Sequence, residues 1–172
     1  MKITFPLTTE QIKELKAGDN VYASGVIYTA RDAAHVRMAE ALAAGTPAPF
    51  EYEGNAVFYA GPCPAPPGRP IGSVGPTTAG RMDAYSPALI KDGLRIMIGK
   101  GNRSPDVINA IKAHNGLYLV GVGGVAALMA KCITKCDCVA YHDLGTEAVW
   151  RLEVQDMPLI VAIDSYGGNV YE

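Results

Sequence analysis

The chain has 172 residues, of which 49% are hydrophobic and 19% charged, and its formal net charge is −2. This length predicts one domain, since domains commonly contain about 100–200 residues, and the apolar content excludes a disordered chain. The mildly acidic balance argues against a nucleic-acid or membrane-surface partner, because both need a basic surface. The opening segment 1–11 also lacks the apolar core of a signal peptide.

The first third of the chain carries clear helix signals. Residues 8–11 (Thr-Thr-Glu-Gln) predict a capping box, and Asp32 is placed to cap an alanine-rich helix. The elements predicted here are a helix from Thr8 to Gly18, a strand over 21–27, a helix from Asp32 to Ala44, a strand around Phe58 and a proline-rich loop over 61–68. The strand pattern predicts a mixed sheet in this part.

The rest of the chain alternates between short apolar runs and helical patterns. The elements predicted here are helices over 86–93, 104–115 and 125–135, strands over 94–98, 117–120, 138–142 and 159–163, and a turn over 166–169. Short strands that alternate with helices indicate an α/β domain with a mostly parallel central sheet.

Three basic residues stand next to predicted strand ends or helix starts. They are Arg31 after the second strand, Arg81 in the segment 75–83, and Lys100 between two glycines. Ligands of open α/β sheets bind outside the carboxyl ends of the strands, and Arg and Lys suit carboxylates or phosphates. Each residue alone is more typical of a surface charge, and the Gly-Lys-Gly motif lacks the spacing of a P-loop.

The segments that hold these cations carry a family resemblance. Residues 28–35 (YTARDAAH), 75–83 (GPTTAGRMD) and 98–102 (IGKGN) resemble the beta part of the iron–sulfur hydro-lyases, the class I fumarases and L(+)-tartrate dehydratases. Residues 141–145 and 148–152 extend the similarity over nearly the whole chain in the family's order. The resemblance implies a single swivelling β/β/α-type domain over residues 1–172.

The resemblance also implies a reaction. Family members add or remove water on a four-carbon dicarboxylate such as fumarate or malate, using a 4Fe-4S cluster that three cysteines of the alpha part hold. Arg31, Arg81 and Lys100 match the contacts to substrate carboxylates, and Thr77 matches an active-site threonine. A threonine hydroxyl is a poor base unless its surroundings deprotonate it. The same cations suit fumarate and tartrate equally.

Other residues of these motifs have structural alternatives. We expect Asp32 and His35 to support the site from the start of a helix, and Asp83 to orient the guanidinium of Arg81. Thr77 has an alternative as a helix cap.

The cysteines do not form a recognisable metal motif. Cys132 and Cys136 are predicted on one apolar helix and Cys138 in the next strand, where cysteine behaves as a small hydrophobe. We therefore expect no metal site in this chain, and a packing role for Cys63. A chain of this size needs no disulfide framework, so a reducing cytoplasm is expected.

The sequence thus predicts a beta subunit that is active only with an alpha subunit, in a heterotetramer of two alpha and two beta chains. The natural-looking start at Met1 favours a separate subunit over an excised domain. Two alternatives of another class are a small-anion or nucleotide-binding module and a scaffold subunit that has lost activity. The missing nucleotide motifs argue against the first, and the retained Arg31, Thr77, Arg81 and Lys100 argue against the second.

Overall fold

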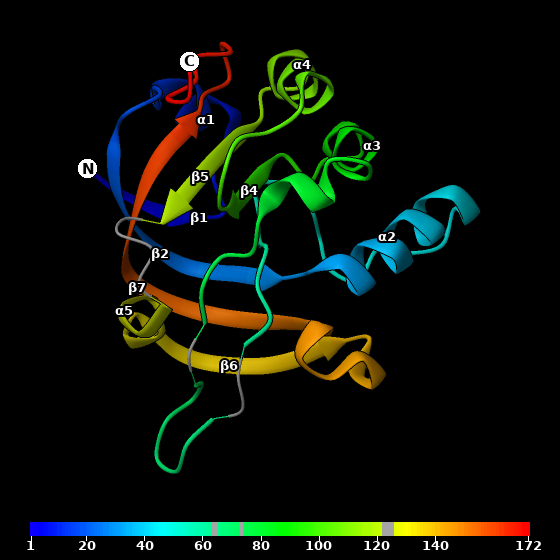
Figure 1. The fold of residues 1–172 in the computed structure, drawn as a ribbon, viewed down its shortest axis with the longest axis vertical. Helices are drawn as coiled ribbons and strands as arrows, with labels where there is room; N and C mark the ends of the chain where they lie inside the picture. Colours follow the sequence, from blue (N-terminus) through cyan, green and yellow to red (C-terminus); the bar gives the residue numbers. More distant parts are fainter. Residues whose placement is uncertain (63–64, 73, 122–125) are drawn as a thin grey trace.

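The computed structural model describes residues 1–62, 65–72, 74–121 and 126–172 (Figure 1). Its strands are β1 (Lys2–Phe5), β2 (Asn20–Thr29), β3 (Ala56–Phe58), β4 (Ile96–Gly99), β5 (Leu117–Gly121), β6 (Ile133–Ala140) and β7 (Val149–Ile163). Its α-helices are α1 (Thr9–Glu14), α2 (Asp32–Ala44), α3 (Ser86–Lys91), α4 (Pro105–Ala113) and α5 (Ala126–Lys131), and its 3-10 helices are η1 (Ala79–Met82) and η2 (His142–Glu147).

The described strands form one sheet in the order β1-β2-β3-β4-β5-β7-β6, with a further pairing between β2 and β7. Strands β1 to β5 pair in parallel, whereas β7 runs antiparallel to β2, β5 and β6. Because β7 pairs with both β2 and β5, the strands β2, β3, β4, β5 and β7 close into a ring. The α/β class is confirmed, and the sheet is partly antiparallel.

Alternating strand residues build two cores on opposite faces of the sheet. Phe58, Ile98 and Leu119 belong to the inner core, which α1 and α5 also enter. Their neighbours Met97 and Tyr118 belong to the outer core, beneath α2, α3 and α4. These helices lie along one side of the sheet in Figure 1. The two sides of the ring and the helices therefore make three layers, as a β/β/α arrangement requires.

Some helix ends with local signals lie where the sequence predicts them, but α1 ends at Glu14, before the predicted end at Gly18. Thr8 and Gln11 form the predicted capping box of α1, and Ser104 accepts a hydrogen bond from Val107 N at the start of α4. Helix α2 ends at Gly45, which has a φ of 71°. Its N-cap is Arg31, and no side chain caps it, so the prediction that Asp32 is the cap was wrong.

The C-terminal third differs most from the prediction. Helix α5 ends at Lys131 and β6 runs from Ile133 to Ala140, so the predicted helix over 125–135 was too long. From Lys135 to Ala140, exposed and half-buried residues alternate along β6, as on an edge strand with period two. Strand β7 begins at Val149 rather than at 159. Every antiparallel pair of described strands involves β7, and one of them is with β2, so the sheet is mixed around this strand of the first third, as predicted.

Two other expectations concern residues at the margins of the fold. The predicted turn over 166–169 is confirmed, because Ile163 and Asn169 form an antiparallel bridge around it. Cys63 lies outside the described residues. Among the described residues, the helices are too short or too polar to cross a membrane.

Gly25 provides a test of how β1 meets β2. Its φ is 105°, and a Cβ there would lie 2.6 Å from the carbonyl oxygen of Phe5. We predict that Gly25→Ala lowers the free energy of unfolding by at least about 2 kcal/mol, since strain and a backbone clash add. Gly18 is the matched control, because its φ is 94° but nothing lies within 4 Å of a Cβ. If urea denaturation showed equal losses in the free energy of unfolding for Gly25→Ala and Gly18→Ala, the close approach of Gly25 to Phe5 would be contradicted.

Candidate functional site

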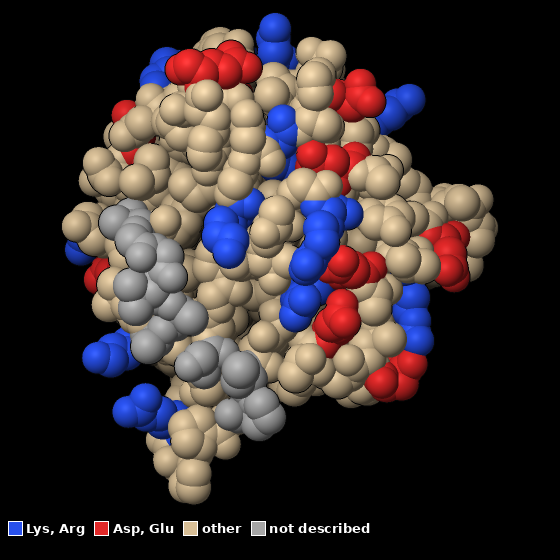
Figure 2. All heavy atoms as spheres, viewed as in Figure 1, with Lys and Arg blue, Asp and Glu red and all other residues tan. Residues whose placement is uncertain are grey.

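The candidate site lies at the carboxyl ends of three neighbouring parallel strands, β2, β3 and β4. Arg31 follows β2 after one intervening residue, and Lys100 directly follows β4. Figure 2 shows basic side chains gathered near the middle of this face of the molecule, with acidic side chains beside them. The fold therefore brings Arg31 and Lys100, which are far apart in the sequence, to one edge of the sheet.

The segment 74–83 is fixed to this edge by its backbone. Thr77 N donates to the carbonyl oxygen of Tyr59 at 2.6 Å, just beyond β3. Thr78 forms a parallel bridge with Lys100, and Ala79 N donates to the carbonyl oxygen of Lys100 at 2.8 Å. Thr77 thus lies between the ends of β3 and β4, with the main chain of Lys100 alongside.

Arg81 is tied to the start of α2. Its Nε lies 3.3 Å from Oδ2 of Asp32, and the two side chains are 49% and 47% exposed. Asp32 directly follows Arg31, so this ion pair places Arg81, on η1, beside Arg31, at the start of α2. The contact that the structure gives this side chain among the described residues is made through Nε and not through the terminal nitrogens. A planar guanidinium held through Nε can still present both terminal nitrogens to a carboxylate.

Two polar atoms at this edge are buried without a partner. Nε of Arg31 and Oδ1 of Asp32 form no hydrogen bond with the described residues. The Arg31 side chain packs on Gly61, where a Cβ would lie 3.1 Å from Cδ and 3.3 Å from Nη1 of the arginine. Buried polar atoms normally find partners, so these two atoms are candidates for contact with a ligand or another chain.

His35 supports Arg31 from below. Its side chain is buried, and its Nδ1 lies 2.9 Å from the carbonyl oxygen of Arg31. The ring also meets Tyr59 edge-on, with centroids 5.3 Å apart. Burial lowers the pKa of His35 to about 4, so the ring is neutral at pH 7 and Nδ1–H donates to Arg31. The contact joins His35 to the backbone of Arg31, and its supporting role in the site stays a prediction.

Thr77 is not a helix cap. The 3-10 helix η1 that follows has Thr78 as its N-cap residue, and no side chain caps it. The half-buried Thr77 side chain therefore does not cap a helix, which was the structural alternative that the sequence offered. Its place beside Tyr59 and Lys100 keeps it a candidate site residue.

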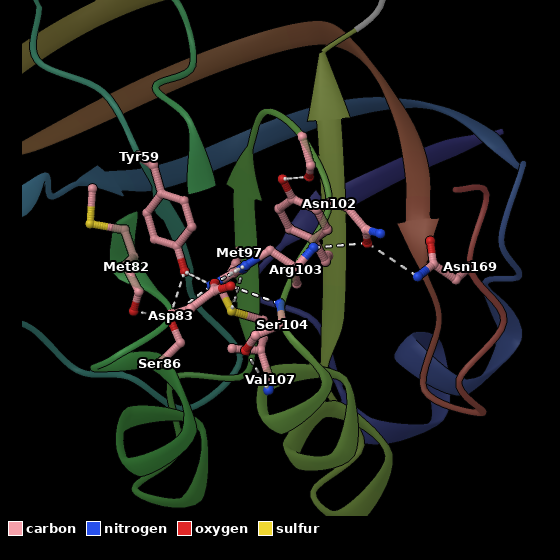
Figure 3. Close-up of polar contacts among 12 residues, drawn as sticks. Tyr59, Met82, Asp83, Ser86, Met97, Asn102, Arg103, Ser104, Val107 and Asn169 are labelled. Atoms are coloured by element: carbon pink, nitrogen blue, oxygen red, sulfur yellow. Dashed lines mark hydrogen bonds and ion pairs between the residues drawn. The ribbon is translucent and has the colours of Figure 1, made fainter. Parts of the chain in front are cut away.

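Asp83 does not orient Arg81. Its Oδ1 accepts a hydrogen bond from Nε of Arg103 at 2.7 Å, and its Oδ2 accepts one from Ser104 N at 2.7 Å (Figure 3). Residues two apart on a helical segment face different directions, which explains why Arg81 turns to Asp32 instead. The expectation from sequence proximity was wrong.

Arg103 is a residue that sequence reasoning missed. Its side chain is fully buried, and Nη2 donates to Oγ of Ser86 at 2.8 Å and to the hydroxyl of Tyr59 at 3.2 Å. Figure 3 shows these groups converging from three separate segments. The available signal was an arginine directly before a Ser-Pro helix start, close to Lys100, where a solvent-exposed charge is the usual interpretation.

The three described cysteines, Cys132, Cys136 and Cys138, do not fit an iron–sulfur cluster. Cys136 and Cys138 lie on β6, and Cys132 follows α5, so the helix predicted to carry both Cys132 and Cys136 does not exist. Burial raises the pKa of Cys136 to about 11, whereas a metal ligand must be a thiolate. In the described part of the chain, no three His, Cys, Asp or Glu side chains gather as a metal site.

Comparisons with known proteins identify relatives along the whole chain. The model of the family described as "Fumarase C-terminus" matches residues 1–172. Fumarate hydratase 2 of Leishmania major is 41% identical over 164 residues, which are 94% of this chain and 29% of that protein. The anaerobic class I fumarate hydratase of Escherichia coli strain K12 is 40% identical over 164 residues, or 94% of this chain and 30% of that protein.

A third relative is similar in size. It is a Methanocaldococcus jannaschii protein, provisionally named as the beta subunit of L(+)-tartrate dehydratase, and it is 39% identical over 183 residues. That match covers 100% of this chain and 92% of the relative. By contrast, the chain spans under a third of the length of the two fumarate hydratases.

The buried His35 predicts a pH dependence of stability. The folded pKa of about 4 lies below the unfolded value of 6.5, so below pH 6.5 the unfolded chain binds a proton that the folded chain rejects. The titration of His35 therefore takes nothing from the free energy of unfolding above pH 6.5 and lowers it as the pH drops toward 4. The His35 contribution to this loss is about 2 kcal/mol between pH 7 and 4.5.

Urea denaturation at both pH values measures the effect. His35→Gln should lose about 2 kcal/mol less than the unaltered protein over this interval, whereas His142→Gln, at an exposed position, should follow the unaltered protein. Identical pH dependence in His35→Gln and the unaltered protein would show that His35 does not titrate in this way.

Proposed function

Because the chain belongs to the fumarase C-terminus family, we propose that it is the beta part of an iron–sulfur hydro-lyase that acts on a four-carbon dicarboxylate, fumarate or malate. In this proposal the chain supplies cations to the substrate carboxylates in a site shared with an alpha part. The observation that carries it is the convergence of Arg31, Arg81 and Lys100 at the carboxyl ends of β2, β3 and β4.

The arrangement of the cations suits a dianion. Arginine grips a carboxylate through two N–H groups, and lysine meets one as a point charge. Arg81 offers its terminal nitrogens while Asp32 holds Nε, and the buried Nε of Arg31 has no partner among the described residues. A small molecule with a carboxylate at each end would supply the missing acceptors.

The same residues have distinct parts in the proposed reaction. Removing a proton beside a carboxylate pushes negative charge onto that group's oxygens, and a fixed cation stabilises the charge as it develops. We assign this stabilisation of developing charge to Arg81. We assign substrate binding to Arg81 together with Arg31 and Lys100. Thr77 lies in the same segment as Arg81 and is assigned to the site, where its hydroxyl is placed for hydrogen bonding rather than as an established base.

The proposal assigns the 4Fe-4S cluster to the alpha part, because the described cysteines of this chain do not fit one. The partner is an alpha subunit, in a heterotetramer of two alpha and two beta chains. The beta-subunit name of the Methanocaldococcus relative supports this partner. The three described cysteines are free, which supports a reducing cytoplasm as the compartment.

An L(+)-tartrate dehydratase beta subunit is the second candidate function. The observation that favours it is the match of the Methanocaldococcus relative, which covers the whole of this chain and 92% of that protein. Fumarate and tartrate present the same two carboxylates to Arg31, Arg81 and Lys100, so only turnover distinguishes the two substrates.

Assembly with an alpha part tests the proposed function directly. We predict that the lone chain, reconstituted anaerobically with iron and sulfide, remains iron-free and inactive. The complex with a family alpha subunit should then hydrate fumarate or dehydrate L(+)-tartrate. A lone chain that hydrates fumarate would contradict the shared site. A complex that binds a dicarboxylate but turns over neither acid would favour the anion-binding module. A complex that shows no binding and no turnover would favour the scaffold.

Substitution of the cations tests their separate parts in the assembled enzyme. We predict that Arg81→Lys lowers turnover at least about a hundredfold, because one electrostatic stabiliser of the transition state is lost. Arg31→Lys should act mainly by raising the Michaelis constant, since it removes binding common to ground and transition states. Steady-state kinetics measure both effects.

Arg95→Lys is the matched control. Arg95 pairs with Glu53 just before β4, at the opposite end of the strand from Lys100, so its loss should leave both constants near normal. Near-normal turnover in Arg81→Lys would remove this residue from the proposed reaction.

A further inference from the structure

We infer that the buried pair Arg103–Asp83 is a positioning pair for the candidate site. The pair sets the distance between two parts of the site. One is the segment that carries Thr77 and Arg81, and the other is the loop that carries Lys100. The inference rests on the proposed function for its kinetic consequence, but the tie between the two segments is a structural statement that can be tested without activity.

Asp83 clamps the loop after β4 to the end of η1. It directly follows the last residue of η1, the helix that contains Arg81. One oxygen of its carboxylate accepts from Nε of Arg103 and the other from Ser104 N, each at 2.7 Å. Both bonds reach the loop that begins at Lys100, so one carboxylate fixes the two cation-bearing segments against each other.

Arg103 extends the tie to β3. Its Nη2 donates to the hydroxyl of Tyr59 at 3.2 Å, and the carbonyl oxygen of Tyr59 accepts from Thr77 N at 2.6 Å. The ring of Tyr59 lies so close to Gly99 that a Cβ there would be 2.8 Å from Cδ2 of the tyrosine. Tyr59 is therefore packed tightly between the end of β4 and the Thr77 segment.

The same tyrosine connects the pair to Arg31. His35 meets the ring of Tyr59 edge-on at 5.3 Å and bonds to the carbonyl oxygen of Arg31 at 2.9 Å. The segment of Thr77 and Arg81 is thus joined to Arg103 through Asp83, and the segment of Arg31 is joined to it indirectly, through Tyr59 and His35. Figure 3 shows the centre of this network, with Arg103 between Tyr59, Asp83 and Ser86.

Arginine is suited to this position in a way that lysine is not. The side chain is fully buried, so its charge must stay paired, because an unpartnered buried charge is strongly unfavourable. Its planar fork donates in fixed directions to Asp83, Ser86 and Tyr59 at once. A lysine ammonium is a single point on a flexible stem and cannot hold all three groups in one plane.

Hydrogen exchange of the assembled full-length protein tests the tie without turnover. The amides of Thr77 and Ala79 report on the segment, since they donate to Tyr59 and Lys100. We predict that these amides exchange at least about tenfold faster in Arg103→Lys and in Asp83→Asn, because local opening becomes easier. In Arg95→Lys, which disturbs the ion pair of another largely buried arginine with the exposed Glu53, they should exchange within about twofold of the unaltered rate.

Kinetics of the same complexes test the consequence for the site. Small misplacements of catalytic groups cost up to about a hundredfold in rate, so kcat/KM for the dicarboxylate should fall at least about tenfold in both variants. The doubly substituted protein should be no worse than either single variant, because the two residues act as one unit. Arg95→Lys should retain normal kcat/KM.

The outcomes separate the two proposals. Unchanged exchange at Thr77 and Ala79 would overturn the positioning pair even in a fully active enzyme. Faster exchange with normal kcat/KM would overturn its role in the reaction and leave only a structural contact. If the unaltered complex turns over no dicarboxylate, the proposed function fails. The hydrogen-exchange measurement still decides whether Arg103 and Asp83 hold the segments together.

Discussion

Strand β7 pairs with β2 and with β5, and this closure determines where the loops of the candidate site lie. The four parallel strands β2 to β5 cannot splay apart, because the ring joins the first to the last. Their carboxyl ends therefore stay at one edge, as in open α/β sheets that bind ligands there. The length of β7 allows it to reach β6 near one end and β5 near the other.

The loops above that edge combine two kinds of ion pair. Arg81 and Asp32 form an outer pair that is about half exposed, whereas Arg103 and Asp83 form an inner pair in the packed layer beneath. The outer cation keeps hydrogen-bonding capacity for a ligand, and the inner one uses its donors within the protein. In the proposed function, this division of the charges leaves the outer cation available to an anion while the inner pair keeps the surrounding segments fixed.

The sequence predicted those features that depend on local bonding. The capping box at Thr8 and the Ser104 cap involve residues three apart, so spacing alone reveals them. The strands β6 and β7 were misjudged because their state depends on pairing across the sheet, which overrides local preference. Arg31, Arg81 and Lys100 were singled out by their positions beside predicted strand ends and helix starts and then by motif resemblance, whereas Thr77 came from the resemblance alone. The partner of Asp83 was missed because Arg103 reaches it through packing distant in sequence.

The outer and inner pairs also differ in how dissolved ions affect them. Salt at physiological strength screens exposed charges beyond about 8 Å, but it barely reaches a buried pair. If the proposed function holds, rising ionic strength weakens the long-range attraction of the Arg81 edge for a dianion and slows encounter. The bonds between Arg103 and Asp83 are largely shielded from these ions, so in that proposal the geometry of the site persists while its rate of anion capture declines.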